Sequence, residues 1–288
     1  MTKLRKENQV AIVALSNALT DQMKSIIDEL CEVFANMGIR CVLSKYLYQK
    51  ESVRGASAKN KARELESFYT QDEIKAVFDV SGGDIANEVL CELDFSKIKE
   101  NPKALWGYSD LTTLINAFYQ MGEISTCLYQ VRNLVGEFSS LQQKQFEASI
   151  MGKEESLFEF EYKFLQGKQM EGIVIGGNIR CFLKLAGTEF MPDFDEKILF
   201  LESRSGGVAQ MITFLSQYKQ LEAFEKVNGI LLGSFTEMDS KQLEPTIEEV
   251  ILEFVDNPDL PIARTKQIGH GQDSKAIRIG QALKLCKG

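Results

Sequence analysis

The sequence has no uninterrupted run of 18 apolar residues, the approximate length that a membrane-spanning helix needs. It has no Cys-x-x-Cys pair, the spacing typical of zinc sites and redox motifs, although six cysteines occur in apolar surroundings. Its first residues lack the apolar stretch and the small-residue cleavage site of a secretory signal. We therefore expect a cytoplasmic protein with reduced, mostly buried thiols, no metal site and no membrane contact.

The charge balance argues against nucleic acid as the main partner. The 41 acidic residues outnumber the 33 lysines and arginines, which gives a net charge of -8, and the basic residues are scattered along the chain. A polyanion is attracted by clustered positive charge, which this sequence does not show. Hydrophobic residues make up 44% and charged residues 26% of the 288 residues, so we expect a globular protein of two domains.

The first half alternates short apolar runs with helical patterns. Strands separated by helices predict parallel pairing, right-handed crossovers, helices on both sheet faces and a ligand site at the carboxyl ends of the strands. The expected strands are 9–15, 40–44, 76–80, 104–107 and 125–129, and the expected helices include 20–37, which ends at Gly38, and 58–68.

The pattern changes after Arg132. We expect a helix at 138–150, an exposed strand at 157–165, a turn at 166–169, and then strands at 172–175, 197–201 and 229–232 with helices at 178–185, 208–224 and 246–255. Short extended pieces are expected near Ile262 and Ile277. The predicted fold class is α/β, with an N-terminal parallel-sheet domain over 1–150, a connection over 151–170 and a smaller C-terminal α/β domain over 171–288.

Residues 76–90 predict a buried strand that runs through a glycine turn into a helix. A catalytic nucleophile is usually presented on such an elbow, but the residue at the elbow is Ala86, which has no atom that can attack a carbonyl. Two other interpretations stay open. The turn Ser81–Asp84 could hold a phosphate, although it lacks the lysine and the third glycine of nucleotide-binding loops, or it could be purely structural.

Further along, His270 is the only histidine and stands between two glycines, where it could act as a general base or lie on a surface loop. Glu202 ends a predicted strand, where it could orient an imidazole or face solvent. Ser109 or Asp110 is expected to cap the helix that follows, and Asn178 is expected to cap the helix at 178–185.

Together these segments resemble the serine peptidase family that contains the LD-carboxypeptidases of murein recycling and the microcin C self-immunity peptidases. The resemblance extends over nearly the whole chain. The segments that it rests on are 58–62, Ser81-Gly82-Gly83-Asp84-Ile85-Ala86-Asn87, Asn101-Pro102-Lys103, Gly107-Tyr108-Ser109-Asp110-Leu111-Thr112, Gly176-Gly177-Asn178, Leu185-Ala186-Gly187-Thr188, 198–202 and Gly269-His270.

The resemblance implies hydrolysis of an amide next to a free carboxylate by a Ser-His-Glu triad. It places the glutamate at Glu202, the histidine at His270 and the nucleophile at Ala86, so this chain lacks the serine. It also implies an oxyanion hole from the backbone N–H groups of Gly83 and Asn87, with Ser81 and Asp84 of the same turn at the substrate site. A cytoplasmic bacterial homodimer that needs no metal or cofactor is implied as well.

Three classes of function follow. The chain is an impaired peptidase acting on a murein tetrapeptide or an aminoacyl-nucleotide, with Ala86 engineered or natural. Alternatively, it is a non-catalytic protein that binds a carboxylate-bearing peptide or peptidoglycan fragment. The third class is an unrelated nucleotide-binding or structural α/β protein. In the first class, Ser81 or Ser109 could replace the missing hydroxyl.

Overall fold

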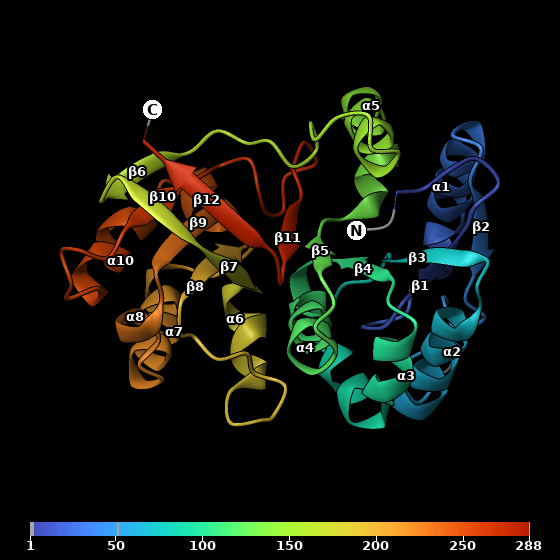
Figure 1. Cartoon of the computed structure of the whole chain (residues 1–288), viewed down its shortest axis with the longest axis horizontal. Helices are drawn as coiled ribbons and strands as arrows, with labels where there is room; N and C mark the ends of the chain where they lie inside the picture. Colours follow the sequence, from blue (N-terminus) through green and yellow to red (C-terminus); the bar gives the residue numbers. More distant parts are fainter. Residues whose placement is uncertain (1–2, 51, 288) are drawn as a thin grey trace.

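The computed structural model, described here for residues 3–50 and 52–287, places two six-stranded sheets side by side (Figure 1). The N-terminal sheet has the order β11-β5-β4-β3-β1-β2, in which β1 to β5 pair in parallel and β11 pairs antiparallel with β5. Its strands are β1 (Gln9–Val13), β2 (Arg40–Leu43), β3 (Ile74–Asp79), β4 (Ala104–Gly107), β5 (Thr126–Leu128) and β11 (Ile277–Ile279).

Helices cover both faces of this sheet. They are η1 (Asp21–Met23), α1 (Lys24–Asn36), α2 (Ala58–Thr70), η2 (Ala86–Glu92), α3 (Phe95–Glu100), η3 (Ser109–Leu111), α4 (Thr112–Gly122), η4 (Val131–Val135) and α5 (Ser139–Ile150), where η marks a 3-10 helix. On one face, Phe78 of β3 contacts Phe34 of α1 and Phe146 of α5. On the other, Tyr69 of α2 packs on Phe118 of α4. Alternate strand residues thus supply two hydrophobic layers.

The C-terminal sheet has the order β12-β7-β8-β9-β10-β6, parallel in the centre and antiparallel at both edges. Its strands are β6 (Lys163–Gln166), β7 (Gln169–Asn178), β8 (Lys197–Ser203), β9 (Gly229–Phe235), β10 (Ile262–Arg264) and β12 (Ala282–Cys286). The helices are α6 (Ile179–Phe182), η5 (Leu183–Leu185), α7 (Val208–Gln220), α8 (Ala223–Lys226), α9 (Thr236–Lys241) and α10 (Ile247–Phe254).

The two domains share one hydrophobic core where α4 meets β7. The Asn116 side chain of α4 donates to the Gly176 carbonyl at 2.8 Å and accepts from the Gly176 N–H at 2.9 Å. The Asn178 N–H donates to the Thr112 hydroxyl at 3.0 Å. Buried residues of α4, β7 and β8 form a single cluster. The carboxyl ends of β7 and β8 are therefore held against the N-terminal domain.

The α/β class is confirmed, but the chain does not divide at residue 171 as simply as expected. Strand β11, which we expected in the C-terminal domain, completes the N-terminal sheet and lies between the two sheets in Figure 1. Strand β6, which we expected in the connection, pairs with β10. Either sheet can accept a further strand at its edge by backbone hydrogen bonding. Which segment pairs there depends on long-range contacts that the local sequence does not encode.

Several local predictions are also corrected. The exposed strand expected at 157–165 is limited to β6, and Leu157 is fully buried. The helix expected at 208–224 is split into α7 and α8, because Glu222 adopts a left-handed φ of +57°. Of the six cysteines only Cys127 and Cys181 are buried. No helix in the described ranges is long and apolar enough to cross a membrane.

Candidate active site

The glycine turn that follows β3 is held from behind by a buried aspartate. Asp79 accepts hydrogen bonds from the Ser81 N–H at 2.7 Å, the Ser81 hydroxyl at 2.6 Å and the Leu15 N–H at 2.6 Å. Burial raises the pKa of Asp79 to about 6 against the lowering effect of these hydrogen bonds. Ser81 is 1% exposed and faces this interior network, so the prediction that it lines the substrate site is wrong.

The turn itself requires glycine at position 83. Gly83 has a φ of +134°, and a Cβ there would lie 2.2 Å from the Asn17 side chain. Asn17 in turn accepts a hydrogen bond from the Asp84 N–H at 3.3 Å. Because the Asn17 side chain packs against the glycine, and η2 is a short 3-10 helix, the turn lacks the open helix N-terminus that a phosphate cradle needs.

Ala86 is fully buried at the start of η2, and its N–H donates to the Asp110 carboxylate at 2.8 Å. It does not have the left-handed backbone of a strained elbow. In this region the non-glycine residue with a positive φ, +56°, is Ser109, which follows β4. The strained strand-to-helix junction is therefore one strand away from the position that the sequence indicated.

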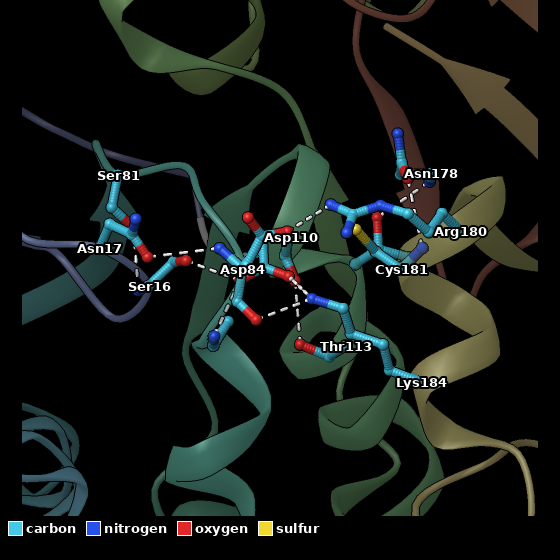
Figure 2. A network of polar contacts seen from close by, with 12 residues as sticks. Ser16, Asn17, Ser81, Asp84, Asp110, Thr113, Asn178, Arg180, Cys181 and Lys184 are labelled. Carbon is cyan, nitrogen blue, oxygen red and sulfur yellow. Dashed lines mark hydrogen bonds and ion pairs between the residues drawn. The ribbon is translucent and has the colours of Figure 1, made fainter. Parts of the chain in front are cut away.

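Asp110 joins the two domains behind the turn, as Figure 2 shows. Its carboxylate is fully buried and also accepts from the Ser16 hydroxyl at 2.6 Å and from the Lys184 ammonium at 2.5 Å. Lys184 belongs to η5 of the C-terminal domain. The capping role expected for Ser109 or Asp110 is wrong, since neither side chain caps α4, and Asp110 instead fixes the start of η2.

A second ion pair crosses the domain boundary nearby. The Arg180 guanidinium of α6 lies 2.6 Å from the Asp84 carboxylate, and Lys184 also donates to the Asp84 carbonyl at 2.9 Å. Arg180 holds the pKa of Asp84 below its ordinary value. Asp84 is exposed at the turn, as is Asn87, while Gly83 lines a cavity. The carboxylate of Asp84 is thus occupied by a cation of this chain.

Glu202 and His270 form a buried pair. The Glu202 carboxylate lies 2.6 Å from Nδ1 of His270, and the two side chains are 1% and 3% exposed. Asn178, the register partner of Glu202 on β7, donates to the other carboxylate oxygen at 3.2 Å. The alternatives of a solvated acid and a surface-loop histidine are therefore wrong. Asn178 also caps α6, as expected, by accepting from the Cys181 N–H.

The backbone at Gly269 allows this pairing. Its φ is +147°, and a Cβ there would lie 2.0 Å from the Ser234 hydroxyl oxygen and 3.2 Å from the Glu202 carboxylate. The His270 ring packs on Tyr108, with ring centroids 4.6 Å apart. Its Nε2 is buried and has no hydrogen-bond partner in the described part of the chain.

This arrangement determines what the imidazole can do. A carboxylate can only accept, so Nδ1 carries the proton toward Glu202 and neutral Nε2 presents its lone pair. That is the orientation of a general base toward a hydroxyl nucleophile. Ala86 supplies no hydroxyl and is fully buried, whereas Ser109 carries a hydroxyl and lines the same cavity as Gly83.

Two cavities meet beside this pair. One, of about 690 Å³, is lined by residues of both domains that include Gly83, Ser109, Asn178 and Arg180. The other, of about 340 Å³, contains His270 and Tyr108. Arg204, two residues beyond Glu202, lines both. The candidate site therefore lies at the carboxyl ends of β4, β7 and β8, where parallel sheets bind ligands.

Sequence reasoning missed the cations at this site. Arg180 lies on α6 and Lys184 on the following η5, and the local pattern of this segment indicates only an amphipathic surface. Nothing nearby in the sequence links the two cations to Asp110 or Asp84. Tyr108 and Asp110 belong to a segment already singled out at the end of β4. For these two, the signal was their position immediately after a buried strand.

Two protein families match this chain. The LD-carboxypeptidase N-terminal domain matches residues 10–129, and the LD-carboxypeptidase C-terminal domain matches residues 171–285. The microcin C7 self-immunity protein MccF of Escherichia coli is 26% identical, over 88% of this chain and 83% of that protein. The murein tetrapeptide carboxypeptidase of Pseudomonas aeruginosa is 24% identical, over 97% of this chain and 93% of that protein.

The fold agrees with these matches. The structure of MccF in complex with aspartyl sulfamoyl adenosine superimposes with a TM-score of 0.87 at 23% identity, covering 98% of this chain and 94% of that one. The N-terminal match extends from β1 to β5, and the C-terminal match extends from β7 to β12. The chain therefore belongs to the LD-carboxypeptidase family of serine peptidases.

Proposed function

We propose that this protein binds a small ligand with a free carboxylate next to an amide, in the inter-domain cavities beside His270, and hydrolyses it poorly or not at all. The ligand classes are a murein tetrapeptide and an aminoacyl-nucleotide. The observation that supports this most directly is the buried Glu202–His270 pair, whose Nε2 has no partner in the described ranges, beside cavities that both domains line.

In a serine form of this site, Glu202 would orient the imidazole and Nε2 would take the proton of the attacking hydroxyl. The N–H groups of Gly83 and Asn87 would stabilise the negative charge on the carbonyl oxygen. Without the nucleophile, a serine-hydrolase triad typically loses on the order of a million-fold in turnover, while binding and the oxyanion hole remain. Binding without efficient hydrolysis is the expected result.

The test compares the unsubstituted protein with Ala86→Ser, using a murein tetrapeptide and aspartyl sulfamoyl adenosine. Calorimetry should detect binding to both proteins, and release of the terminal amino acid or the nucleoside should occur with Ala86→Ser alone. Glu202→Gln in the serine form should abolish turnover and leave binding. Equal turnover by the unsubstituted protein and the Ala86→Ser variant would show that the nucleophile lies elsewhere, and no binding to either would refute the proposal.

The non-catalytic alternative differs in one respect. If the lineage has specialised in binding, Ala86→Ser should bind the same ligands with unchanged affinity and still fail to turn them over. We also propose that the protein is a cytoplasmic homodimer, as the family resemblance implies. Light scattering coupled to size-exclusion chromatography tests the dimer directly, since a mass of 32.4 kDa would identify a monomer.

A further inference from the structure

The cavity that contains His270 is cationic, although the chain as a whole is acidic. Arg132 of η4 and Arg204 beyond β8 both line it, and none of the residues that line it is an aspartate or a glutamate. The sequence has a net charge of -8, so a pocket with two arginines and no acid is a local reversal of the overall charge. Such a reversal concentrates small anions at the site.

Neither of these two guanidinium groups has a carboxylate counter-ion among the residues that the structure describes. The Nε of Arg132 is buried without a hydrogen-bond partner, and no ion pair or hydrogen bond involves the guanidinium of Arg132 or Arg204 within residues 3–50 and 52–287, although the Arg132 backbone N–H donates to the Gln130 side chain. By contrast, Arg180 in the larger cavity is paired with Asp84 at 2.6 Å. A buried, unpaired guanidinium N–H is costly unless a ligand or water accepts from it. The Arg204 side chain is exposed, so an anion in this cavity would satisfy the buried Nε of Arg132 and pair with the guanidinium of Arg204.

A third polar atom faces the same space, and the walls are already fixed. His270 is 3% exposed in its side chain, and its Nε2 has no partner in the described ranges. The loop that follows it is tied to the N-terminal domain, because Asn133 donates to the Gly271 carbonyl at 3.4 Å and the Glu137 N–H donates to Gln272 at 2.8 Å. The cavity is therefore preformed between the two domains.

We propose that Arg132 and Arg204 bind an oxyanion of the ligand, a carboxylate or a phosphoryl group, in the cavity beside His270. The proposal rests on the proposed function and adds to it the position of the ligand's anionic end. Planar guanidinium groups match the two oxygens of such an anion in bidentate geometry. Arg204 borders both cavities, so the remainder of the ligand would extend toward Ser109 and Asn178.

The first experiment uses pyrophosphate, which tests the anion site without assuming a ligand. Arg132→Gln, Arg204→Gln and Arg132→Lys are compared with the unsubstituted protein and with Arg63→Gln, which removes the same charge from an exposed position on α2. Calorimetry should show at least tenfold weaker binding for the two glutamine variants at the cavity, partial recovery for Arg132→Lys and no change for Arg63→Gln. Absent binding, or equal loss in all variants, overturns the inference.

A second set of titrations distinguishes the source of the anion and separates this inference from the proposed function. A tenfold loss for the murein tetrapeptide but not for its C-terminal amide identifies a carboxylate. A loss for AMP but not for adenosine identifies a phosphate. If pyrophosphate binding needs the arginines and neither ligand class binds, the anion site stands and the proposed function fails. If the ligands bind equally to every variant, the anion site fails and the proposed function stands.

Discussion

Asp110→Asn should destabilise the protein strongly, because Asp110 is the point at which the two domains are tied together. The carboxylate is fully buried and accepts from Ser16, Ala86 and Lys184 at 2.5 to 2.8 Å. Removing one partner of a buried ion pair typically costs about 3–5 kcal/mol, since the other charge stays buried. The Lys184 side chain is 19% exposed and keeps some hydration, so we expect about 3 kcal/mol.

Urea unfolding measures this loss, and a double-mutant cycle assigns it. Lys184→Met leaves the Asp110 carboxylate buried with its two neutral donors, so it should cost a similar amount. The double variant should lose at least about 1 kcal/mol less than the sum of the two single losses, because the pair then disappears together. Lys24→Gln is the matched control, since its pair with Asp21 is exposed on both sides, and it should leave the unfolding midpoint unchanged.

The Ala86 N–H provides a local readout in the same experiment. It donates to Asp110, so its hydrogen exchange should accelerate in Asp110→Asn more than in Lys184→Met. A loss in stability below about 1 kcal/mol for Asp110→Asn, or strict additivity in the cycle, would refute the reasoning that this pair holds the domains together.

Three further predictions concern the turn, the loop and the neighbouring serine. Burial raises the pKa of Asp79 from 3.8 to about 6, so the folded state favours the protonated carboxyl group. The contribution of Asp79 to stability is therefore fully present below about pH 4 and is lost as the pH rises through about 6. The free energy of unfolding relative to Asp79→Asn should therefore fall by on the order of 3 kcal/mol between about pH 4 and pH 7, and a flat difference in urea titrations would contradict the shift. Gly269→Ala should lower stability by about 2 kcal/mol more than Gly187→Ala, because both glycines have a positive φ but a Cβ meets Ser234 only at position 269; equal thermal shifts would exclude the clash. Ser109→Ala should leave any residual hydrolysis by the Ala86 protein unchanged, and its loss in a fluorogenic assay would instead identify Ser109 as the nucleophile.

Much of the fold could be predicted because its information is local. The alternation of buried strands and amphipathic helices placed β1, β3, β4 and α1 within a few residues of their observed bounds. Gly38, with a φ of +77°, ends the first helix as expected. The edge strands β11 and β12 could not be assigned to a sheet in this way, since a few residues of extended chain pair wherever the tertiary fold leaves an edge.

The candidate site likewise has a part that the sequence predicted and a part that depends on long-range contacts. Ala86, Glu202 and His270 were located through the resemblance, and the structure brings Glu202 and His270 together across 68 residues. Ser81 was misplaced because a strand-end residue faces the core or the cleft according to strand register, and here Asp79 draws its hydroxyl inward.

By itself, therefore, the sequence determined the α/β class, the glycine turn after β3 and the absence of a hydroxyl at position 86. Only the tertiary structure decided which charges are neutralised. Asp110 meets Lys184 across 74 residues and Asp84 meets Arg180 across 96, whereas Arg132 and Arg204 meet in one cavity without a carboxylate. Electrostatic interactions depend on distance and burial in three dimensions, and a linear order of residues specifies neither until the two domains pack together.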